Sequence, residues 1–155
     1  MAKFFVTGGL GFIGSNLIEY LLNKGHNVIN IDKISYASNF YNTKEFKNNK
    51  NYKFYKSDIC NKKNLDYLIK KYKPKCIFNL AAETHVDRSI DNSDSFIKSN
   101  ILGVQSLLEV LVKNKRTKLI HISTDEVYGN IKKNVRTTEK SPYNPLNPYA
   151  ATKAA

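Results

Sequence analysis

A run of closely spaced glycines separates the first two regular segments of the chain. Residues 3–7 (KFFVT) form an apolar segment of strand length, and residues 15–24 carry apolar side chains at helical spacing. Between them, Gly8, Gly11 and Gly14 recur at every third position. Glycine permits a tight turn and lets the backbone approach a ligand, and the N–H groups at the start of a helix bind anions. A strand, a glycine-rich turn and a helix in this order therefore predict a dinucleotide site.

Segments typical of strands and helices alternate along the whole chain. Strands are predicted over 3–7, 27–31, 52–56, 76–80 and 119–123. Helices are predicted over 15–24, near 43–47, over 65–72, over 93–113 and from Pro148 onward, with a loop over 130–147. This alternation predicts an α/β fold in which a doubly wound parallel sheet has the strand order 3-2-1-4-5. The length of 155 residues predicts a single domain.

Several residues fall at the carboxyl ends of the predicted strands, where ligands bind in such sheets. Asp32 ends the second strand, and a carboxylate there can accept hydrogen bonds from the ribose hydroxyls of adenosine. This favours NAD over NADP. Asp58 and Ile59 follow the third strand, and the small residues Ala81 and Ala82 follow the fourth.

The formal net charge of +12 raises the alternative of nucleic-acid binding. The chain has only three arginines, however, and its lysines are spread along the sequence. Arg is the residue that best recognises phosphates and base edges, so the charge favours a solvated surface over a nucleic-acid interface. No apolar run reaches the length that spans a membrane. We expect a cytoplasmic protein. We also expect no metal site, because His85 has no partner at ligand spacing.

A second pattern of chemically active side chains lies near the end of the chain. Thr124, Asp125 and Glu126 follow the fifth strand, and Tyr149 precedes Lys153 by four residues. Residues four apart share one helix face, so the Lys ammonium can stabilise a phenolate that removes a proton from an alcohol. The acidic pair suggests a second step with one general acid and one general base. The alternatives are a solvated acidic turn and a surface Tyr/Lys pair.

On these residues the chain resembles the extended short-chain dehydrogenase/reductase family and, within it, the dTDP-glucose 4,6-dehydratases. The motifs that carry the resemblance are 7–15 (TGGLGFIGS), 32–37 (DKISYA), 58–60 (DIC), 81–90 (AAETHVDRSI), 123–129 (STDEVYG) and 141–149 (SPYNPLNPY). The resemblance implies a Rossmann-like domain, NAD as the cofactor, a nucleotide-sugar substrate and a homodimer joined through the long helix and the Tyr/Lys helix. It also implies that residues 1–155 are one NAD-binding domain that stops before a sixth strand and lacks a substrate-binding domain.

The resemblance also implies a role for individual residues. The implied cofactor contacts are Gly8, Gly11, Phe12, Ile13, Gly14, Asp32, Lys33, Ser35, Asp58, Ile59, Leu80, Ala81, Ala82, Ser99, Tyr149 and Lys153. The implied substrate contacts are Thr84 and Thr124, and the implied catalytic residues are Thr124, Asp125, Glu126, Tyr149 and Lys153.

The implied reaction converts dTDP-glucose to the 4-keto-6-deoxy sugar without net redox. Tyr149 would take the C4 hydroxyl proton while C4 passes hydride to NAD, and Lys153 would lower the pKa of this Tyr. Thr124 would hydrogen-bond the C4 carbonyl, Glu126 would remove the C5 proton, and Asp125 would protonate the leaving C6 hydroxyl.

Two other interpretations stay open. The chain could act on another nucleotide sugar, as a UDP-glucose 4,6-dehydratase or a nucleotide-sugar epimerase does. It could also be a non-catalytic NAD-binding module, and we expect residues 1–155 alone to have little activity.

Overall fold

The chain forms two compact units in the computed structural model, which describes residues 1–131 and 134–155. The first unit contains residues 1–81 and 103–122, and the second contains residues 82–102 and 123–155. The loop predicted over 130–147 belongs to the second unit, and its residues 132–133 lie outside the described residues.

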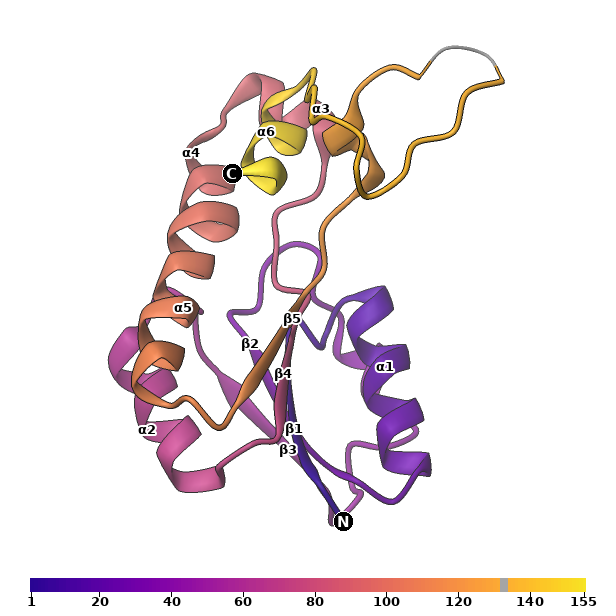
Figure 1. Cartoon of the computed structure of the whole chain (residues 1–155). Helices are drawn as coiled ribbons and strands as arrows, with labels where there is room; N and C mark the ends of the chain where they lie inside the picture. The colour runs from indigo at the N-terminus through magenta and orange to yellow at the C-terminus, as the bar shows by residue number, and fades with distance from the viewer. Residues whose placement is uncertain (132–133) are drawn as a thin grey trace. The chain divides into compact units, whose positions relative to one another are not determined.

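A five-stranded parallel sheet forms the centre of the first unit (Figure 1). Its strands are β1 (Lys3–Thr7), β2 (Asn27–Asp32), β3 (Tyr52–Lys56), β4 (Cys76–Asn79) and β5 (Lys118–His121). The order β3-β2-β1-β4-β5 confirms the predicted topology. The prediction placed β5 one residue too late and extended it through Ser123. The last backbone bond on this strand pair runs from the Ile122 N–H to the Asn79 carbonyl, so the chain leaves the sheet there.

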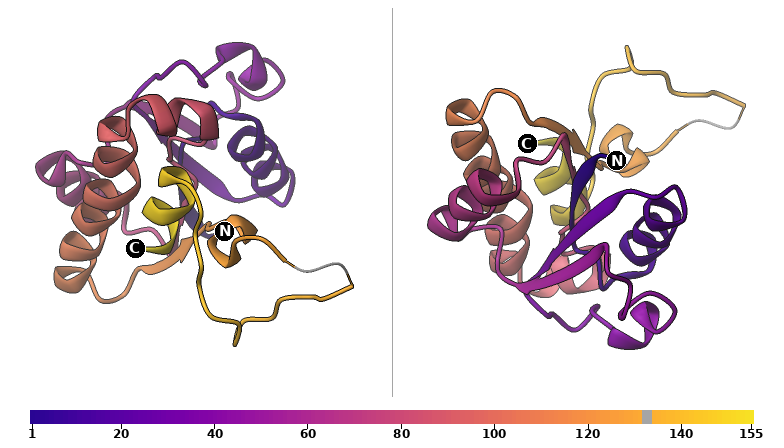
Figure 2. Two further views of the ribbon diagram at one scale, coloured as in Figure 1. Left: turned by 90° about the horizontal axis from the view of Figure 1, so that it is seen from above. Right: turned by 90° about the horizontal axis from the view of Figure 1, so that it is seen from below.

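Helices cover both faces of this sheet (Figures 1 and 2). On one face α1 (Phe12–Asn23) packs Ile18, Leu21 and Leu22 against Val6 and Val28. The other face carries α2 (Lys62–Tyr72) and α5 (Gly103–Lys113). The core on that face contains Phe5, Ile29, Ile31, Ile59, Leu65, Leu68, Ile69, Ile77, Leu107, Val110 and Leu111. Burial of apolar area on both faces is the main stabilising contribution to a sheet of this kind.

Two local predictions in the first unit differ from the structure. Helix α1 begins at residue 12 rather than 15, because Gly11 serves as its N-cap and its carbonyl already accepts the Ser15 N–H at 3.0 Å. The short helix predicted near 43–47 is the 3₁₀ helix η1 (Phe40–Thr43). Its start is set by the side chain of Asn39, which accepts a hydrogen bond from the Tyr41 N–H at 2.8 Å.

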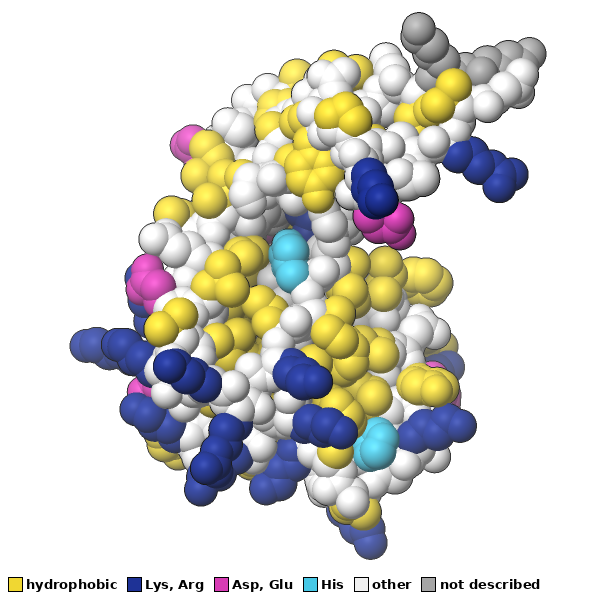
Figure 3. Space-filling view, in the orientation of Figure 1, with side chains coloured by type: hydrophobic (Ala, Val, Ile, Leu, Met, Phe, Trp, Pro, Cys, Tyr) yellow, Lys and Arg dark blue, Asp and Glu magenta, His cyan; other side chains and the backbone are white. Residues whose placement is uncertain are grey.

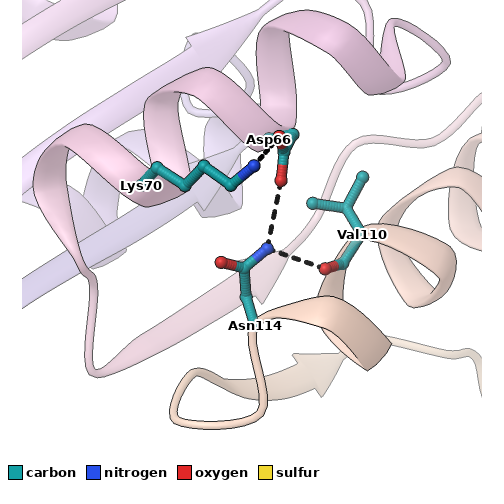
Figure 4. A network of polar contacts seen from close by, with 4 residues as sticks. All are labelled: Asp66, Lys70, Val110 and Asn114. Atoms are coloured by element: carbon teal, nitrogen blue, oxygen red, sulfur yellow. Dashed lines mark hydrogen bonds and ion pairs between the residues drawn. The ribbon is translucent and has the colours of Figure 1, made fainter.

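A polar network joins the end of α5 to α2 (Figure 4). The Asn114 Nδ2 donates to Asp66 Oδ1 at 3.2 Å and to the Val110 carbonyl at 2.9 Å. The Lys70 Nζ lies 2.6 Å from the other carboxylate oxygen of Asp66, and this hydrogen bond lowers the pKa of Asp66. Asn114 therefore closes the last turn of α5 and fixes its direction against α2.

One helical stretch of the described chain, Asp94–Lys113, is long and apolar enough to cross a membrane by length and hydropathy alone. This stretch differs from the expectation that no apolar run reaches the length that spans a membrane. Core helices of globular proteins meet the same criteria, and α5 buries Leu107, Val110 and Leu111 in the core of the first unit. We therefore interpret the hydropathy of α5 as that of a core helix.

The second unit consists of short helices within its described residues. They are α3 (Val86–Asp91), α4 (Asp94–Phe96), the π-helix η2 (Ile97–Leu102), the 3₁₀ helix η3 (Asp125–Tyr128) and α6 (Pro148–Ala154). The π-helix interrupts what was predicted as one regular helix over 93–113, and such interruptions are frequent at functional sites. Neither α3 nor η3 was predicted, since both are short and lack an apolar periodicity. Phe96 packs edge-on against Tyr149 at 6.4 Å between ring centres.

Replacing a core leucine of α2 tests the packing of the first unit. Leu68 has no exposed surface, so Leu68→Ala should lower the free energy of unfolding by about 2–5 kcal/mol, because a cavity remains where the side chain was. Lys63 is exposed on the same helix, and Lys63→Ala should change stability by less than about 0.5 kcal/mol. Urea denaturation followed by circular dichroism measures both values. Equal losses in the two variants would contradict this packing.

Candidate functional site

The glycine turn after β1 is shaped by backbone contacts that exclude side chains. Gly8 has φ +69°, and a Cβ there would lie 2.8 Å from the backbone nitrogen of Ala81. A Cβ on Gly14 would overlap the carbonyl oxygen of Gly8. Both positions therefore require glycine: Gly8 for its positive φ and its close approach to Ala81, and Gly14 for the contact of α1 with the turn.

The start of α1 leaves backbone donors available. Gly11 has no side chain to cap the helix, and the first N–H groups of a helix have no partner within it. The side chains of Phe12 and Ile13 are 81% and 63% exposed. This donor set, together with the positive end of the helix dipole, fits the pyrophosphate of a dinucleotide.

Asp32 is buried, and its carboxylate is largely engaged within the chain. One oxygen accepts the Leu10 N–H at 3.0 Å, and the other accepts the Ile34 N–H and the Ser38 hydroxyl, both at 2.8 Å. The carboxylate thus links the glycine turn to the turn that contains Lys33 and Ser35. The oxygen bonded to Leu10 accepts one hydrogen bond and retains a second lone pair, which fits a ribose hydroxyl.

The other predicted cofactor residues of the first unit follow β3 and β4. The Asp58 Oδ1 accepts the Cys60 N–H at 2.9 Å and so forms a local turn. The side chain of Ile59 is part of the core, so only its backbone faces away from the hydrophobic cluster. After β4, the Leu80 N–H donates to the Thr7 carbonyl and the Ala81 N–H donates to the Thr7 hydroxyl, both at 3.2 Å.

Thr7 and Asn79 also have a structural role that the sequence analysis missed. The Thr7 hydroxyl donates to Asn79 Oδ1, and Asn79 Nδ2 lies 3.0 Å from His121 Nδ1. These side chains join the carboxyl ends of β1, β4 and β5. His121 is the half-buried last residue of β5. The sequence did contain a signal for this role, because Thr7 and Asn79 are polar residues at the ends of apolar strands.

The acidic residues of the second unit lie on one short turn. Thr124 is the N-cap of η3, and its hydroxyl accepts the Glu126 N–H at 3.3 Å. The same hydroxyl lies 3.4 Å from the Asp125 carboxylate. Asp125 is exposed, whereas Glu126 is half-buried. The two adjacent carboxylates therefore occupy different environments.

Helix α6 carries the predicted Tyr/Lys pair and is held at its first turn. Asn147 is its N-cap and accepts the Ala150 N–H at 2.7 Å, and Pro148 occupies the first helical position. The Tyr149 N–H donates to the Ser89 hydroxyl of α3 at 3.1 Å. Asn147 Nδ2 donates to Glu126 Oε2 at 2.8 Å, so α6 is bonded directly to the acidic turn.

The electrostatic environment of the pair differs from the one expected. Burial raises the pKa of Tyr149, a hydrogen bond with Thr124 lowers it in part, and the charges of Glu126 and Asp125 raise it further. Lys153 is not among these causes, although we expected it to lower this pKa. Burial lowers the pKa of Lys153 itself to about 8.

Asn100 in the π-helix connects two segments that are distant in the sequence, the loop that contains Glu83 and helix α6. Its amide accepts the Glu83 N–H at 2.9 Å and donates to the Glu83 carbonyl at 3.0 Å. It also donates to the Thr152 hydroxyl of α6 at 3.0 Å. A polar Asn within the apolar helix predicted over 93–113 was the signal that could have revealed this role.

The predicted residues therefore fall into two groups. The first unit contains Gly8, Gly11, Phe12, Ile13, Gly14, Asp32, Lys33, Ser35, Asp58, Ile59, Leu80 and Ala81. The second unit contains Ala82, Thr84, Ser99, Thr124, Asp125, Glu126, Tyr149 and Lys153. Thr84 is exposed beside Glu83, and Ser99 is buried beside Asn100. No group of three or more His, Cys, Asp or Glu side chains in the described part of the chain could hold a metal ion.

Comparison with known proteins gives similar sequences over almost the entire chain. A dTDP-glucose 4,6-dehydratase from Haemophilus influenzae is 46% identical over 166 residues, which cover 100% of this chain and 49% of that protein. The crystal structure of a dTDP-glucose 4,6-dehydratase from Bacillus anthracis in complex with NAD has a TM-score of 0.91 and 38% identity. It matches 99% of this chain and 47% of that one.

Epimerases of nucleotide sugars are also similar. The UDP-glucose 4-epimerase from Thermus thermophilus, in complex with NAD, has a TM-score of 0.87 and 30% identity, over 98% of this chain and 47% of that one. The chain thus spans about half the length of the relatives it matches. A family model described as GDP-mannose 4,6 dehydratase matches residues 5–155. The sequence match, the parallel sheet and the glycine turn agree, and the chain belongs to this dehydratase family.

Proposed function

We propose that residues 1–155 are the NAD-binding and catalytic part of a dTDP-glucose 4,6-dehydratase. The observation that carries this proposal is the link between the acidic turn and the Tyr/Lys helix. Glu126 is hydrogen-bonded to the N-cap of α6, and the charges of both carboxylates raise the pKa of the Tyr149 phenol. An alcohol oxidation needs the phenol and the amine, and an elimination needs a separate acid and base.

The proposed cofactor is NAD, held by the backbone donors of α1 and by the residues around Asp32. When bound, NAD would accept a hydride from C4 of the sugar and return it to C6. The Asp32 carboxylate disfavours a 2′-phosphate by charge, which supports NAD over NADP. The relatives from Bacillus anthracis and Thermus thermophilus were crystallised with NAD, and this likeness supports the same choice.

In this proposal the residues of the second unit move the protons. Tyr149 takes the proton of the C4 hydroxyl, with Thr124 hydrogen-bonded to the same oxygen. The protonated Lys153 stabilises the phenolate, which is needed because burial raises the pKa of Tyr149. Glu126 then removes the C5 proton that the C4 ketone has made acidic, and Asp125 protonates the leaving hydroxyl at C6. Glu126 would return its proton to C5 when the hydride is returned to C6. Thr84 contributes to substrate binding.

A second candidate is a UDP-glucose 4,6-dehydratase or a nucleotide-sugar epimerase. The likeness to the Thermus thermophilus epimerase favours this candidate. The adjacent Asp125 and Glu126 favour dehydration, because an epimerase performs no elimination. Assay of a protein extended to the length of the relatives, with dTDP-glucose and UDP-glucose in parallel, tests the proposal. Formation of the 4-keto-6-deoxy product from dTDP-glucose supports it, and a 4-epimer as the only product would refute it.

We also propose a homodimer that forms through α5. Val104 is half-buried, whereas Leu108 and Val112 are 50% and 68% exposed, and all three share one side of the helix. Such an exposed apolar stripe is typical of an interface. The cytoplasmic location, the absence of nucleic-acid and membrane partners, and the assignment of 1–155 to one NAD-binding domain remain predictions. Lys and Arg side chains lie at several separate places on the face shown in Figure 3, which supports the interpretation of the charge as a solvated surface.

Asp125→Asn should separate the two halves of the reaction. The amide cannot donate a proton to the leaving hydroxyl, so dehydration of dTDP-glucose should slow by about 10²–10⁴-fold. Oxidation at C4 should stay near the parental rate. It can be measured with dTDP-6-deoxyglucose, which has no C6 hydroxyl to lose. Unchanged dehydration would remove Asp125 as the acid.

Tyr149→Phe should stop the reaction before either step. Without the phenol no side chain on α6 takes the C4 proton, so oxidation of dTDP-6-deoxyglucose and dehydration of dTDP-glucose should both fall by at least ~10²-fold. Stopped-flow absorbance at the cofactor band and product analysis measure the two rates. Hydride transfer at the parental rate in this variant would show that another group is the base.

Leu108→Lys should weaken the proposed dimer. A charge in the centre of the apolar stripe must be desolvated on association, so the variant should sediment as a monomer at concentrations where the parent is a dimer. Gln105 is exposed on the same helix, and Gln105→Lys is the matched control. A dimer of unchanged stability in Leu108→Lys would place the interface elsewhere.

A further inference from the structure

We propose that Asn147 is a positioning residue for the carboxylate of Glu126 and thereby for proton removal at C5 of the sugar. This inference rests on the proposed function, because it concerns the base of the same reaction. Asn147 lies two residues before Tyr149, and the expected site residues did not include it.

The orientation of the Asn147 amide follows from its role as a helix cap. Its backbone is extended, with φ −141° and ψ 162°, as expected for an N-cap. The Ala150 N–H lies 2.7 Å from Oδ1, and a backbone N–H must face an acceptor. The amide oxygen of Asn147 is therefore the atom that accepts the hydrogen bond from the helix. The nitrogen then necessarily points the other way, where Glu126 Oε2 accepts from it at 2.8 Å.

This hydrogen bond restrains the side chain of Glu126. A glutamate has three rotatable side-chain bonds, and ordering such a side chain opposes binding or catalysis entropically. Among the described residues, no other hydrogen bond to the Glu126 carboxylate is present besides that of Asn147. The second oxygen of the carboxylate thus remains available for a substrate proton. Asp125, by contrast, is exposed and has no bond to Asn147.

The backbone around the contact supports a defined geometry. The Asn144 N–H donates to the Val127 carbonyl at 2.9 Å, which joins the segment before α6 to η3. Gly129 has φ +70°, and a Cβ there would overlap the Asn144 carbonyl oxygen. The acidic turn and the chain that leads into α6 are therefore packed closely at the backbone. Asn147 extends this contact to the reacting carboxylate, and so relates the positions of Glu126 and Tyr149.

Substitution of Asn147 can separate its two roles, which are capping α6 and donating a hydrogen bond to Glu126. Asn, Asp and Ser are similarly effective N-caps, because each offers an oxygen to the helix. Of these three, Asn alone can also donate an N–H from the same side chain to a carboxylate. An Asp would place a second negative charge beside Glu126. A Ser keeps only a hydroxyl on a shorter side chain. Both substitutions keep α6 capped and remove the amide N–H that Glu126 accepts.

The test uses Asn147→Ser and Asn147→Asp in a protein extended to the length of the relatives. Two rates are measured with dTDP-6-deoxyglucose in deuterated solvent: oxidation at C4, and exchange of the C5 hydrogen, followed by mass spectrometry. Exchange at C5, and dehydration of dTDP-glucose, should slow by about 10–10²-fold with KM little changed, since misplacement of a catalytic group by 1 Å has an effect of this size. Oxidation at C4 should stay within about twofold. The loss should be larger for Asp than for Ser, because like charges repel.

Asn61→Asp is the matched control. Asn61 caps α2 in the first unit, where its Oδ1 accepts the Asn64 N–H at 3.1 Å. This substitution keeps a cap and approaches no proposed catalytic group, so both rates should equal those of the parent. Thermal denaturation of all variants checks that the fold is retained.

The possible outcomes distinguish this inference from the proposed function. Failure of the parent protein to dehydrate dTDP-glucose would overturn the proposed function. A parent that dehydrates the sugar, together with Asn147 variants that exchange C5 at the parental rate, would overturn the positioning role alone. A parallel loss of C4 oxidation and C5 exchange would also overturn it, because that pattern indicates a displaced α6. Selective loss of C5 exchange supports it.

Discussion

The parallel pairing of β1 with β2 and β4 is the constraint on which the first unit depends. It places Thr7 opposite Ile31 and Asn79, so the three strands end at one edge of the sheet. The loops that follow β1, β2 and β4 therefore start side by side at this edge. The glycine turn can therefore bond to Asp32 through Leu10. A side chain at Gly8 would meet the backbone of Ala81 for the same reason. The donors of α1 are held by backbone geometry rather than by their own side chains.

The second unit relies on side-chain hydrogen bonds where the first relies on strand pairing. Its described elements are short, and helices of this length are unstable without tertiary contacts. Asn100 joins the π-helix to the backbone of Glu83 and to α6, and Ser89 accepts the N–H of Tyr149. Asn147 then bonds the start of α6 to Glu126. Three small polar side chains thus determine where the phenol and the acidic turn lie within this unit.

Much of the fold could be predicted because its signals are local. Apolar runs bounded by glycine, aspartate or proline marked each strand to within two residues, and the alternation of strands and helices implied their order. Pro148 at the first turn of α6 was recognised for the same reason. The elements that escaped prediction, α3, η3 and the π-helix, have no apolar period of their own. They exist because contacts with distant residues, such as that of Asn100 with Glu83, stabilise them.

The sequence by itself determined the parallel sheet, the glycine turn and the set of reactive side chains, since these depend on residue type and spacing. Only the tertiary structure decided how those side chains are held. The Asp32 carboxylate is engaged by the backbone of residues beyond its own strand, and Asn147 faces Glu126 across 21 positions of sequence. The pKa of Tyr149 is raised by burial, whereas its spacing from Lys153 suggested the opposite. Burial and long-range hydrogen bonds arise only when distant segments pack together, and spacing along the chain does not encode them directly.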